Sequence, residues 1–223
     1  MNEQKIWNKL INAGLTAAGA AGLMGNLYAE SGLNPINMEN QYERKLGFTD
    51  ETYTHAVDAG TYTNFANDCA GYGLAQWTYC TRKANLLAFA RNRGCSVGDL
   101  DMQVDFLLQE LRTDYPAVWR TLTTADNIRA ASDAVILQFE RPADTSETAR
   151  RRRAQFGVQF YEKLAVTAQD GTTGLSDELQ HPPCPEQYPD TAGVRLLADE
   201  IRAGTWGTDW EMNVMAALHG VVS

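Results

Sequence analysis

The sequence is poor in the residues that hold metals or build disulfide frameworks. Its four cysteines, Cys69, Cys80, Cys95 and Cys184, form no CxxC pair, and their spacing fits neither a zinc ribbon nor a dense disulfide scaffold. We therefore expect reduced, partly buried thiols. The three histidines, His55, His181 and His219, have no partner at metal-ligand spacing. We expect no metal site and no cofactor.

The sequence also lacks a long apolar run. No stretch approaches the roughly 20 apolar residues that a membrane-spanning helix needs. The first ten residues, MNEQKIWNKL, do not show a basic segment followed by an apolar one. We therefore expect a soluble protein, made in the cytoplasm without a signal peptide and with no membrane partner.

Basic charge is scarce, and the acidity is concentrated at the C-terminal end. The net charge is −9, with 17 Lys and Arg against 19 Asp and Glu in residues 1–165, but 2 against 9 in residues 166–223. Nucleic acid is not expected as a partner, because neutralising phosphates requires clustered basic residues. The one basic run, Arg150 to Arg153, falls in a helical pattern and would wrap around that helix, so a solvated helix is expected there.

What the chain does have is helical periodicity over most of its first 165 residues. Apolar spacing predicts helices at 3–13, 16–30, 81–93, 100–111, 125–139 and 146–164. Between them, residues 34–78 are rich in Asn, Gly, Thr and Tyr, and the alternation at 60–68 predicts a short strand or hairpin. The expected fold class is α+β, mainly α, with a small β-like insertion in a domain spanning 1–165.

The amino-acid composition changes after this domain. Residues 166–192 contain four of the seven prolines and a Gly-Thr-Thr-Gly run, which indicates a linker. Residues 193–223 regain helical periodicity but are too few to bury much core alone. This small helical C-terminal segment either docks on the domain or is one unit of a repeat.

One acid, Glu30, stands out at the end of the predicted helix 16–30. Leu23, Leu27 and Glu30 are spaced i, i+4 and i+7, so the carboxyl group shares a face with apolar side chains. Partial burial and the negative end of the helix dipole both favour its protonated form. A protonated acid is what a glycosidic leaving oxygen requires. The alternative is an ordinary solvated Glu at a helix end.

A second stretch, AGYGLAQWTYC at 70–80, strengthens the first. Gly71 and Gly73 permit a tight turn or the close approach of a ligand. The side chains that follow, Gln76, Trp77 and Tyr79, offer amide and aromatic surfaces of the kind that hold sugars, although the aromatic rings could equally belong to the core. Three glycines at 19, 22 and 25 would let another helix approach the Glu30 helix closely.

Together these stretches resemble a known family. Glu30-Ser31-Gly-Leu-Asn-Pro35, followed by Gly71-Tyr72-Gly73-Leu-Ala-Gln76-Trp77, resembles the first two motifs of the lytic transglycosylase and goose-type lysozyme superfamily. The segments AAGLMGNLYAESGLNP, YTNF and FERPAD (139–144) are more similar to the phage tail lysozyme family, from about residue 14 to 164.

The resemblance implies a lysozyme-like fold that cleaves the β-1,4 bond between N-acetylmuramic acid and N-acetylglucosamine in peptidoglycan. Glu30 matches the general acid. Asp68, three residues before Gly71 and about one residue out of register, is the nearest match to an aspartate that helps activate water. Thr78 stands where a second aspartate is expected and could at most orient water. The resemblance further implies substrate contacts from Ser31, Tyr72, Gly73, Gln76, Trp77 and Tyr79.

The identity of the second carboxylate determines the product. Two carboxylates about 6.5 to 9.5 Å apart leave room for a water and give hydrolysis with inversion, which we prefer. With Glu30 alone, as in lytic transglycosylases, a 1,6-anhydro product would form. Glu140 corresponds roughly to the third motif and is either a substrate contact or a buried acid paired with Arg141 or another Arg.

The C-terminal segment has a looser resemblance. LADEIRAGTWG (197–207) is similar to the start of a short cell-wall-binding repeat of phage lysins, in which Trp206 and Gly207 belong to the defining run. The alternative is a terminal helix that docks on the domain.

These observations leave three classes of function open. The first is an active muramidase of phage, prophage or mobile-element origin whose partner is the glycan strand. A phage tail, secretion or conjugation apparatus is a further candidate partner. The muramidase would act on the bacterial cell wall after release by a holin, a particle or a secretion machine. The second is a non-catalytic tail or wall-binding protein. The third, an amidase or peptidase, lacks a recognisable Cys/His or metal arrangement.

Overall fold

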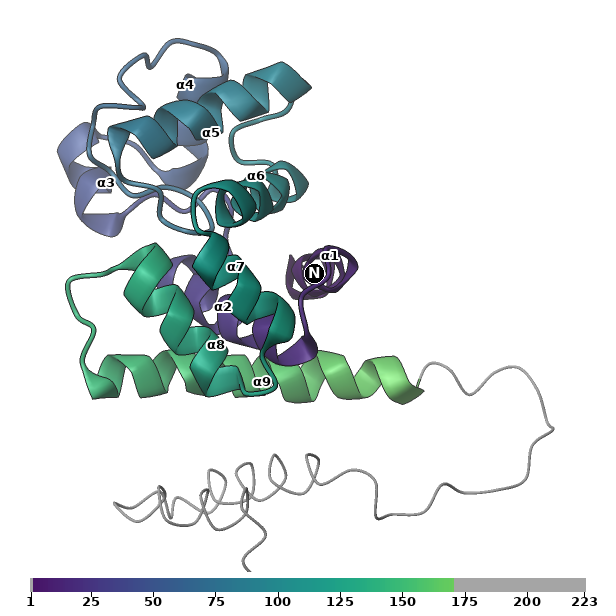
Figure 1. Ribbon diagram of the computed structural model, residues 1–223. Coiled ribbons are helices and arrows are strands. Elements are labelled where there is room, and N and C mark those ends of the chain that lie inside the picture. The colour runs from purple at the N-terminus through teal and green to yellow at the C-terminus, as the bar shows by residue number, and fades with distance from the viewer. Residues whose placement is uncertain (1, 171–223) are drawn as a thin grey trace, which may run out of the picture. The chain divides into compact units, whose positions relative to one another are not determined.

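The computed structural model describes residues 2–170, with side chains up to residue 165, and the regular structure of this part of the chain is helical (Figure 1). Its elements are α1 (Asn2–Asn12), α2 (Ala17–Ser31), α3 (Asn40–Leu46), α4 (Asp50–Asp58), α5 (Cys80–Arg93), α6 (Leu100–Thr113), α7 (Pro116–Thr124), α8 (Ile128–Ala134), the π-helix η1 (Val135–Glu140) and α9 (Glu147–Asp170). None of the described helices is both long and apolar enough to cross a bilayer. The predicted linker after Asp170 and the C-terminal segment with Trp206 and Gly207 lie outside the described residues.

Helix α2 is the central element of the described domain. It begins where the Thr16 side chain accepts a hydrogen bond from the Gly19 amide, and it ends at Gly32 in the left-handed conformation. Every residue from Ala18 to Leu27 is buried. Helices α1, α7, α8 and α9 all pack against it, with α9 running along much of its length (Figure 1). The predicted helix at 16–30 is therefore confirmed.

Three glycines set how closely the neighbours approach α2. A β-carbon at Gly19 would lie 1.9 Å from the Leu122 carbonyl oxygen in α7, and one at Gly22 would lie 2.7 Å from the Ser132 amide in α8. At Gly25 it would lie 2.3 Å from the Arg153 carbonyl oxygen and 2.6 Å from the Gly157 amide in α9. The predicted close approach thus involves three helices, each meeting α2 backbone to backbone.

The predicted β-like insertion is wrong as to secondary structure. Residues 40–58 form the short helices α3 and α4, and residues 60–68 form turns with no strand. Within residues 2–170 the β pairing consists of two isolated bridges, between Met38 and Tyr72 and between Tyr72 and Trp77. These residues form a loop in which only Phe65 and Asp68 are buried, so the alternation in the sequence does not correspond to alternating burial.

This loop region is held by a buried ion pair. Lys83 Nζ lies 2.5 Å from Asp68 Oδ1, and neither side chain has measurable solvent exposure. Asp68 also accepts hydrogen bonds from the Tyr53 and Tyr62 hydroxyls and from the Ala70 amide. Lys83 donates further to the Ala70 carbonyl and lies 4.4 Å from the Phe65 ring centroid. Burial lowers the pKa of Lys83, although the Asp68 carboxylate opposes that shift. Both charges are thus matched by partners, as a stable buried pair requires.

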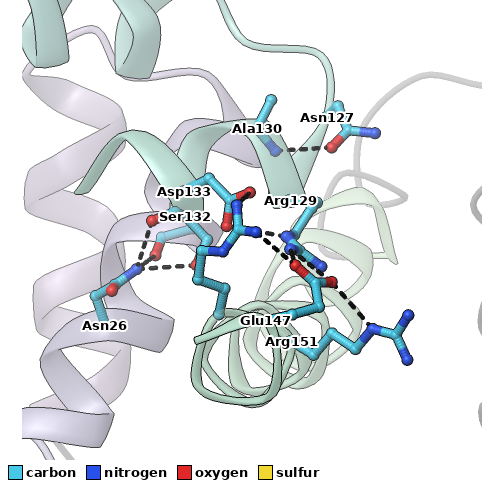
Figure 2. A network of polar contacts seen from close by, with 10 residues as sticks. Asn26, Asn127, Arg129, Ala130, Ser132, Asp133, Glu147 and Arg151 are labelled. Carbon is cyan, nitrogen blue, oxygen red and sulfur yellow. Dashed lines mark hydrogen bonds and ion pairs between the residues drawn. The ribbon is translucent and has the colours of Figure 1, made fainter. Parts of the chain in front are cut away.

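A second polar network joins α2, α8 and α9 (Figure 2). The Asn26 side-chain amide donates to the Gly22 carbonyl and to both oxygens of Ser132. Next to it, Arg129 binds Asp133 and Glu147, and Glu147 also pairs with Arg150 and Arg151. Asp133 accepts from Arg150 as well. The network ties the start of α9 to α8.

The solvated helix expected for the Arg150 to Arg153 run is therefore only partly correct. The four residues do wrap around α9, but they do so to meet different partners. Arg152 lies over the Phe156 ring, while the Arg153 side chain is 11% exposed and points to α2. The surrounding acids are Glu30 of α2, Asp133 of α8 and Glu147 of α9 itself, and the first two could not be inferred from the run.

Two smaller expectations need correction. Cys69, Cys80 and Cys95 are free thiols, but they are exposed and not partly buried. The predicted helix at 125–139 is split into α8 and the π-helical η1, which ends at Arg141 in the left-handed conformation. Helices α3, α4 and α7 were not predicted, because they are short and carry few buried residues.

Replacing Gly25 with Ala should destabilise the domain by about 2 kcal/mol or more. The new methyl group would meet backbone atoms of α9, which cannot rotate away, and this outweighs the better helix propensity of Ala. Urea denaturation followed by circular dichroism would measure the change. Ala29→Ser, on the exposed part of the same helix, is the control and should change the free energy of unfolding by less than about 0.5 kcal/mol. Equal stability of Gly25→Ala and the wild type would contradict the close contact.

Replacing Lys83 with Met should cost about 3 to 5 kcal/mol, because it leaves the Asp68 carboxylate buried without its cation. The double variant Asp68→Asn/Lys83→Met removes both charges and should recover much of that loss. Both changes in the free energy of unfolding can be read from the same denaturation curves. A double variant no more stable than Lys83→Met alone would show that the pair is not the source of the effect.

Candidate active site

Glu30 lies in the last turn of α2, beside two fully buried leucines of the same face, Leu23 and Leu27. Its side chain is 18% exposed, so the carboxyl group is mostly but not completely removed from solvent. The atom Oε1 is buried and accepts no hydrogen bond from any described residue. The helix face predicted from the spacing is therefore observed, and the acid lies at its edge.

Arg153 of α9 is the cation that faces this acid. Its Nη2 lies 2.6 Å from Glu30 Oε1, close enough for an ion pair but not aligned as a hydrogen bond. Its Nη1 donates to Asn26 Oδ1 at 3.4 Å, one turn earlier in α2. Because Asn26 is itself fixed to Ser132 in α8, the guanidinium is held from two sides.

Glu140, the last residue of η1, brings a second acid to Glu30. Its Oε1 is buried and likewise accepts no hydrogen bond from the described residues. Burial raises the pKa of Glu140 well above its ordinary value, and the nearby Glu30 carboxylate raises it further, whereas Arg82 and Arg153 oppose the shift. No ion pair joins Glu140 to an arginine in the described residues, and Arg141 is exposed.

Arg82 of α5 binds Glu110 of α6 and contacts Phe139, the residue before Glu140. Its guanidinium binds Glu110 through two nitrogens, at 2.8 and 2.9 Å, and lies 4.7 Å from the Phe139 ring centroid. The Trp77 indole N–H donates to the same Glu110 carboxylate at 2.8 Å. A bidentate pair of this kind has a fixed orientation. It therefore fixes α5 against α6, and the contact of Arg82 with Phe139 adds η1 to them.

The second motif forms a tight turn that contacts the end of α2. Tyr72 and Trp77 exchange two backbone hydrogen bonds, and Gly73 adopts a φ of 73°, which a glycine accommodates without strain. A β-carbon on Gly73 would also meet the Gln103 side chain at 2.7 Å. The Ser31 hydroxyl donates to the Leu74 carbonyl at 2.9 Å. The two motifs, about 40 residues apart, are thus joined directly.

The other side chains predicted to contact substrate lie in different environments. Tyr72 and Trp77 are completely buried, and Tyr72 bonds to the Thr54 hydroxyl, so both rings are part of the core. Gln76 is partly buried and donates to Asn37. The Thr78 hydroxyl, which is exposed, donates to the Gln76 carbonyl. Tyr79 is 74% exposed and is free to meet a ligand.

Asp68, predicted to activate water, is the buried carboxylate of the pair with Lys83. Its four donors are the lysine ammonium, two tyrosine hydroxyls and a backbone amide, and its side chain has no exposure to solvent. In the part of the chain that the structure describes, no group of three or more His, Cys, Asp or Glu side chains is arranged to hold a metal ion.

Two residues near the acids were missed in the sequence. Arg153 belongs to a basic run, and Arg82 lies in an amphipathic helix that carries no motif, so neither residue stood out in the sequence. A partial indication exists for Arg153, because Gly157 lies one turn later and pairs with Gly25 at the crossing of α2 and α9. Without the fold, nothing links these two glycines.

Comparison with known proteins identifies the family of this chain. Residues 1–164 match the family described as phage tail lysozyme. The chain is 26% identical over 165 residues to morphogenesis protein 1 of Bacillus phage B103, a region that makes up 70% of this chain and 38% of that protein. It therefore spans less than half the length of that relative. With the family match covering the whole helical domain up to Leu164, the chain belongs to the phage tail lysozyme family.

Proposed function

We propose that this protein cleaves the β-1,4 bond between N-acetylmuramic acid and N-acetylglucosamine in peptidoglycan, with Glu30 as the proton donor. The observation that carries the proposal is the state of the Glu30 carboxyl group in a chain of this family. Its side chain is mostly buried but keeps 18% exposure to solvent, and its one charged neighbour is Arg153, whose Nη2 lies 2.6 Å from Oε1, so the carboxyl group is both fixed and reachable. A general acid must be able to reach the leaving oxygen in this way.

Arg153 supports the second half of the proton transfer. When Glu30 gives its proton to the glycosidic oxygen, it becomes a carboxylate in a partly buried place. A guanidinium 2.6 Å away and already fixed by Asn26 stabilises that developing charge without first having to move. The cost of ionising Glu30 is lowered at the stage of the reaction where the charge forms.

Whether the reaction is hydrolysis or lytic transglycosylation depends on which group attacks the anomeric carbon. Hydrolysis with a second carboxylate holding the water was expected, with Asp68 in that role, and remains our first candidate. One observation favours the second candidate, a lytic transglycosylase: the Asp68 carboxylate is fully engaged by Lys83, two tyrosines and an amide. Glu30 would then also accept the proton of the muramic 6-hydroxyl, giving a 1,6-anhydro product.

The names of the family and of one relative support a proposal for the biological setting. The family is named for phage tails, and the similar Bacillus phage B103 protein is named for morphogenesis. We propose that this protein acts on the bacterial cell wall, with glycan strands as its substrate and a phage tail or a related secretion or conjugation apparatus as its carrier. Tyr79, the most exposed of its large apolar side chains, offers a ring on which a sugar could stack.

Glu30→Gln should lower the rate of glycan cleavage by about 10²- to 10⁴-fold, because the amide keeps the shape of the side chain but cannot donate the proton. Release of soluble muropeptides from purified peptidoglycan would measure the rate. Glu51→Gln removes the same charge at an exposed position in α4 and is the control, with activity close to the wild type. Equal activity of Glu30→Gln and the control would remove Glu30 from the mechanism.

The products and the role of Asp68 can be tested together. New reducing muramic ends indicate a hydrolase, and 1,6-anhydromuramic ends indicate a transglycosylase, as read by mass spectrometry of the muropeptides. If Asp68 serves only the fold, Asp68→Asn/Lys83→Met should cleave at nearly the wild-type rate per folded molecule. A loss of about 10²-fold or more in a folded double variant would assign Asp68 the role of base.

A further inference from the structure

A pocket lies between α5 and α6, two neighbouring helices of the described domain (Figure 1). Its volume is about 330 Å³, near the lower end of the range of roughly 300 to 1,000 Å³ that is usual for small-ligand sites. Neither Glu30, Arg153 nor Glu140 lines it, so it is distinct from the place where the candidate acid lies. We call it the α5/α6 pocket, and its lining includes Asn85, Phe89 and Asn92 of α5 and Phe106, Gln109 and Thr113 of α6.

Each of the two helices turns one aromatic ring and several polar side chains to the pocket. Asn85, Phe89 and Asn92 are spaced i, i+4 and i+7, which places them on one face of α5. Phe106 and Gln109 are spaced i and i+3 on α6. The two ring centroids lie 5.4 Å apart, and Phe106 is buried while Phe89 is partly buried. The rings therefore form an apolar floor below the polar side chains.

The polar side chains above this floor have hydrogen-bonding capacity that the protein itself does not use. Asn85, Asn92 and Gln109 are exposed, and their side-chain amides form no hydrogen bond with any other described residue. An amide group offers both donors and an acceptor. The Thr113 hydroxyl donates to the Gln109 carbonyl and can still accept from a ligand. A matching ligand has hydroxyl or amide groups of its own together with an apolar face.

The charge of the pocket selects against acidic ligands. No Lys, Arg or His is among its described lining residues. The buried carboxylate in its wall, Glu110, is matched by two nitrogens of Arg82 and by the Trp77 indole N–H. Asp114, which is exposed, adds a negative charge at the C-terminal end of α6, where the helix dipole is also negative. Ligands that carry phosphate or carboxylate groups are therefore disfavoured, and an uncharged ligand is favoured.

We propose that the α5/α6 pocket is a second carbohydrate site, which binds the uncharged N-acetylglucosamine unit of a glycan strand and takes no part in bond cleavage. The acetamido group of that sugar has the donor and the acceptor that complement the free amides of the rim, and its apolar ring face fits the phenylalanine floor. N-acetylmuramic acid carries an additional carboxylate, which Asp114 repels. The inference does not depend on Glu30, because a site that only binds sugar needs no proton donor.

Binding of tri-N-acetylglucosamine, followed in ¹H–¹⁵N NMR spectra of the full chain, tests the site. The side-chain amide signals of Asn85, Asn92 and Gln109 should shift with increasing sugar, with a Kd of roughly 1 mM for a small ligand in a partly exposed site. Asn92→Ala/Gln109→Ala should weaken this binding by about tenfold or more, because it removes hydrogen bonds to the ligand.

Asn12→Ala, at the exposed end of α1, is the matched control and should bind the sugar like the wild type. A titration in which no signal of α5 or α6 moves overturns the proposal. So does a control variant that loses as much affinity as the double variant, because the pocket amides would then have no special part in binding.

Two comparisons test which sugar the pocket takes. Maltotriose lacks the acetamido group and should bind at least about fivefold more weakly than tri-N-acetylglucosamine. N-acetylmuramic acid should bind more weakly than N-acetylglucosamine, and Asp114→Asn should reduce that difference. Equal binding of maltotriose, or of N-acetylmuramic acid by the wild type, contradicts the assigned sugar.

The same spectra separate this inference from the proposed function, because signals of α2 near Glu30 report on the candidate active site. A sugar that shifts only the α2 signals overturns the pocket and leaves the proposed function standing. A protein that binds the sugar at α5 and α6 but leaves peptidoglycan intact keeps the pocket and overturns the proposed function.

Discussion

The close packing of α2 is the constraint on which the rest of the described domain depends. Gly19, Gly22 and Gly25 let three helices reach its backbone, at α7, α8 and α9 in turn. These contacts lie on helix surfaces where a single methyl group would not fit. Because α2 cannot shift against its neighbours, the position of Glu30 at its end is fixed by backbone contacts a full turn or more away, and so is the distance to Arg153 on α9.

Two buried charged groups in this domain differ in how completely they are satisfied. The Asp68 and Lys83 pair has a partner for every polar atom it brings into the core, and it joins the loop after α4 to α5. The group of Glu30, Glu140 and Arg153 leaves two carboxylate oxygens without hydrogen bonds. A satisfied network gives rigidity, whereas unsatisfied acids keep their capacity to exchange protons. The first group therefore stabilises the loop after α4, whereas the second keeps carboxylate oxygens that no hydrogen bond engages.

The second motif (residues 71–77) positions the end of α2 through its backbone more than through its side chains. Its tight turn, with Gly73 in the left-handed conformation, brings the Leu74 carbonyl to the Ser31 hydroxyl, and its tryptophan is anchored on Glu110 inside the core. The motif thus holds the end of α2 through the hydrogen bond of Ser31. Tyr79, directly after it, is by contrast exposed to solvent.

The sequence alone determined the mainly helical class, the main helices and the face on which Glu30 lies, because these follow from local spacing and caps along one segment. It also determined the family, through two motifs whose combination is specific. It misread residues 60–68 as a strand and Arg153 as solvated, since burial there comes from residues far away in the chain. Only the tertiary structure decided which charges meet: Asp68 with Lys83, Glu30 with Arg153, and Glu140 beside Glu30. The physical reason is that electrostatic energy depends on distances through space and on burial, and neither is encoded in the neighbours of a residue along the sequence.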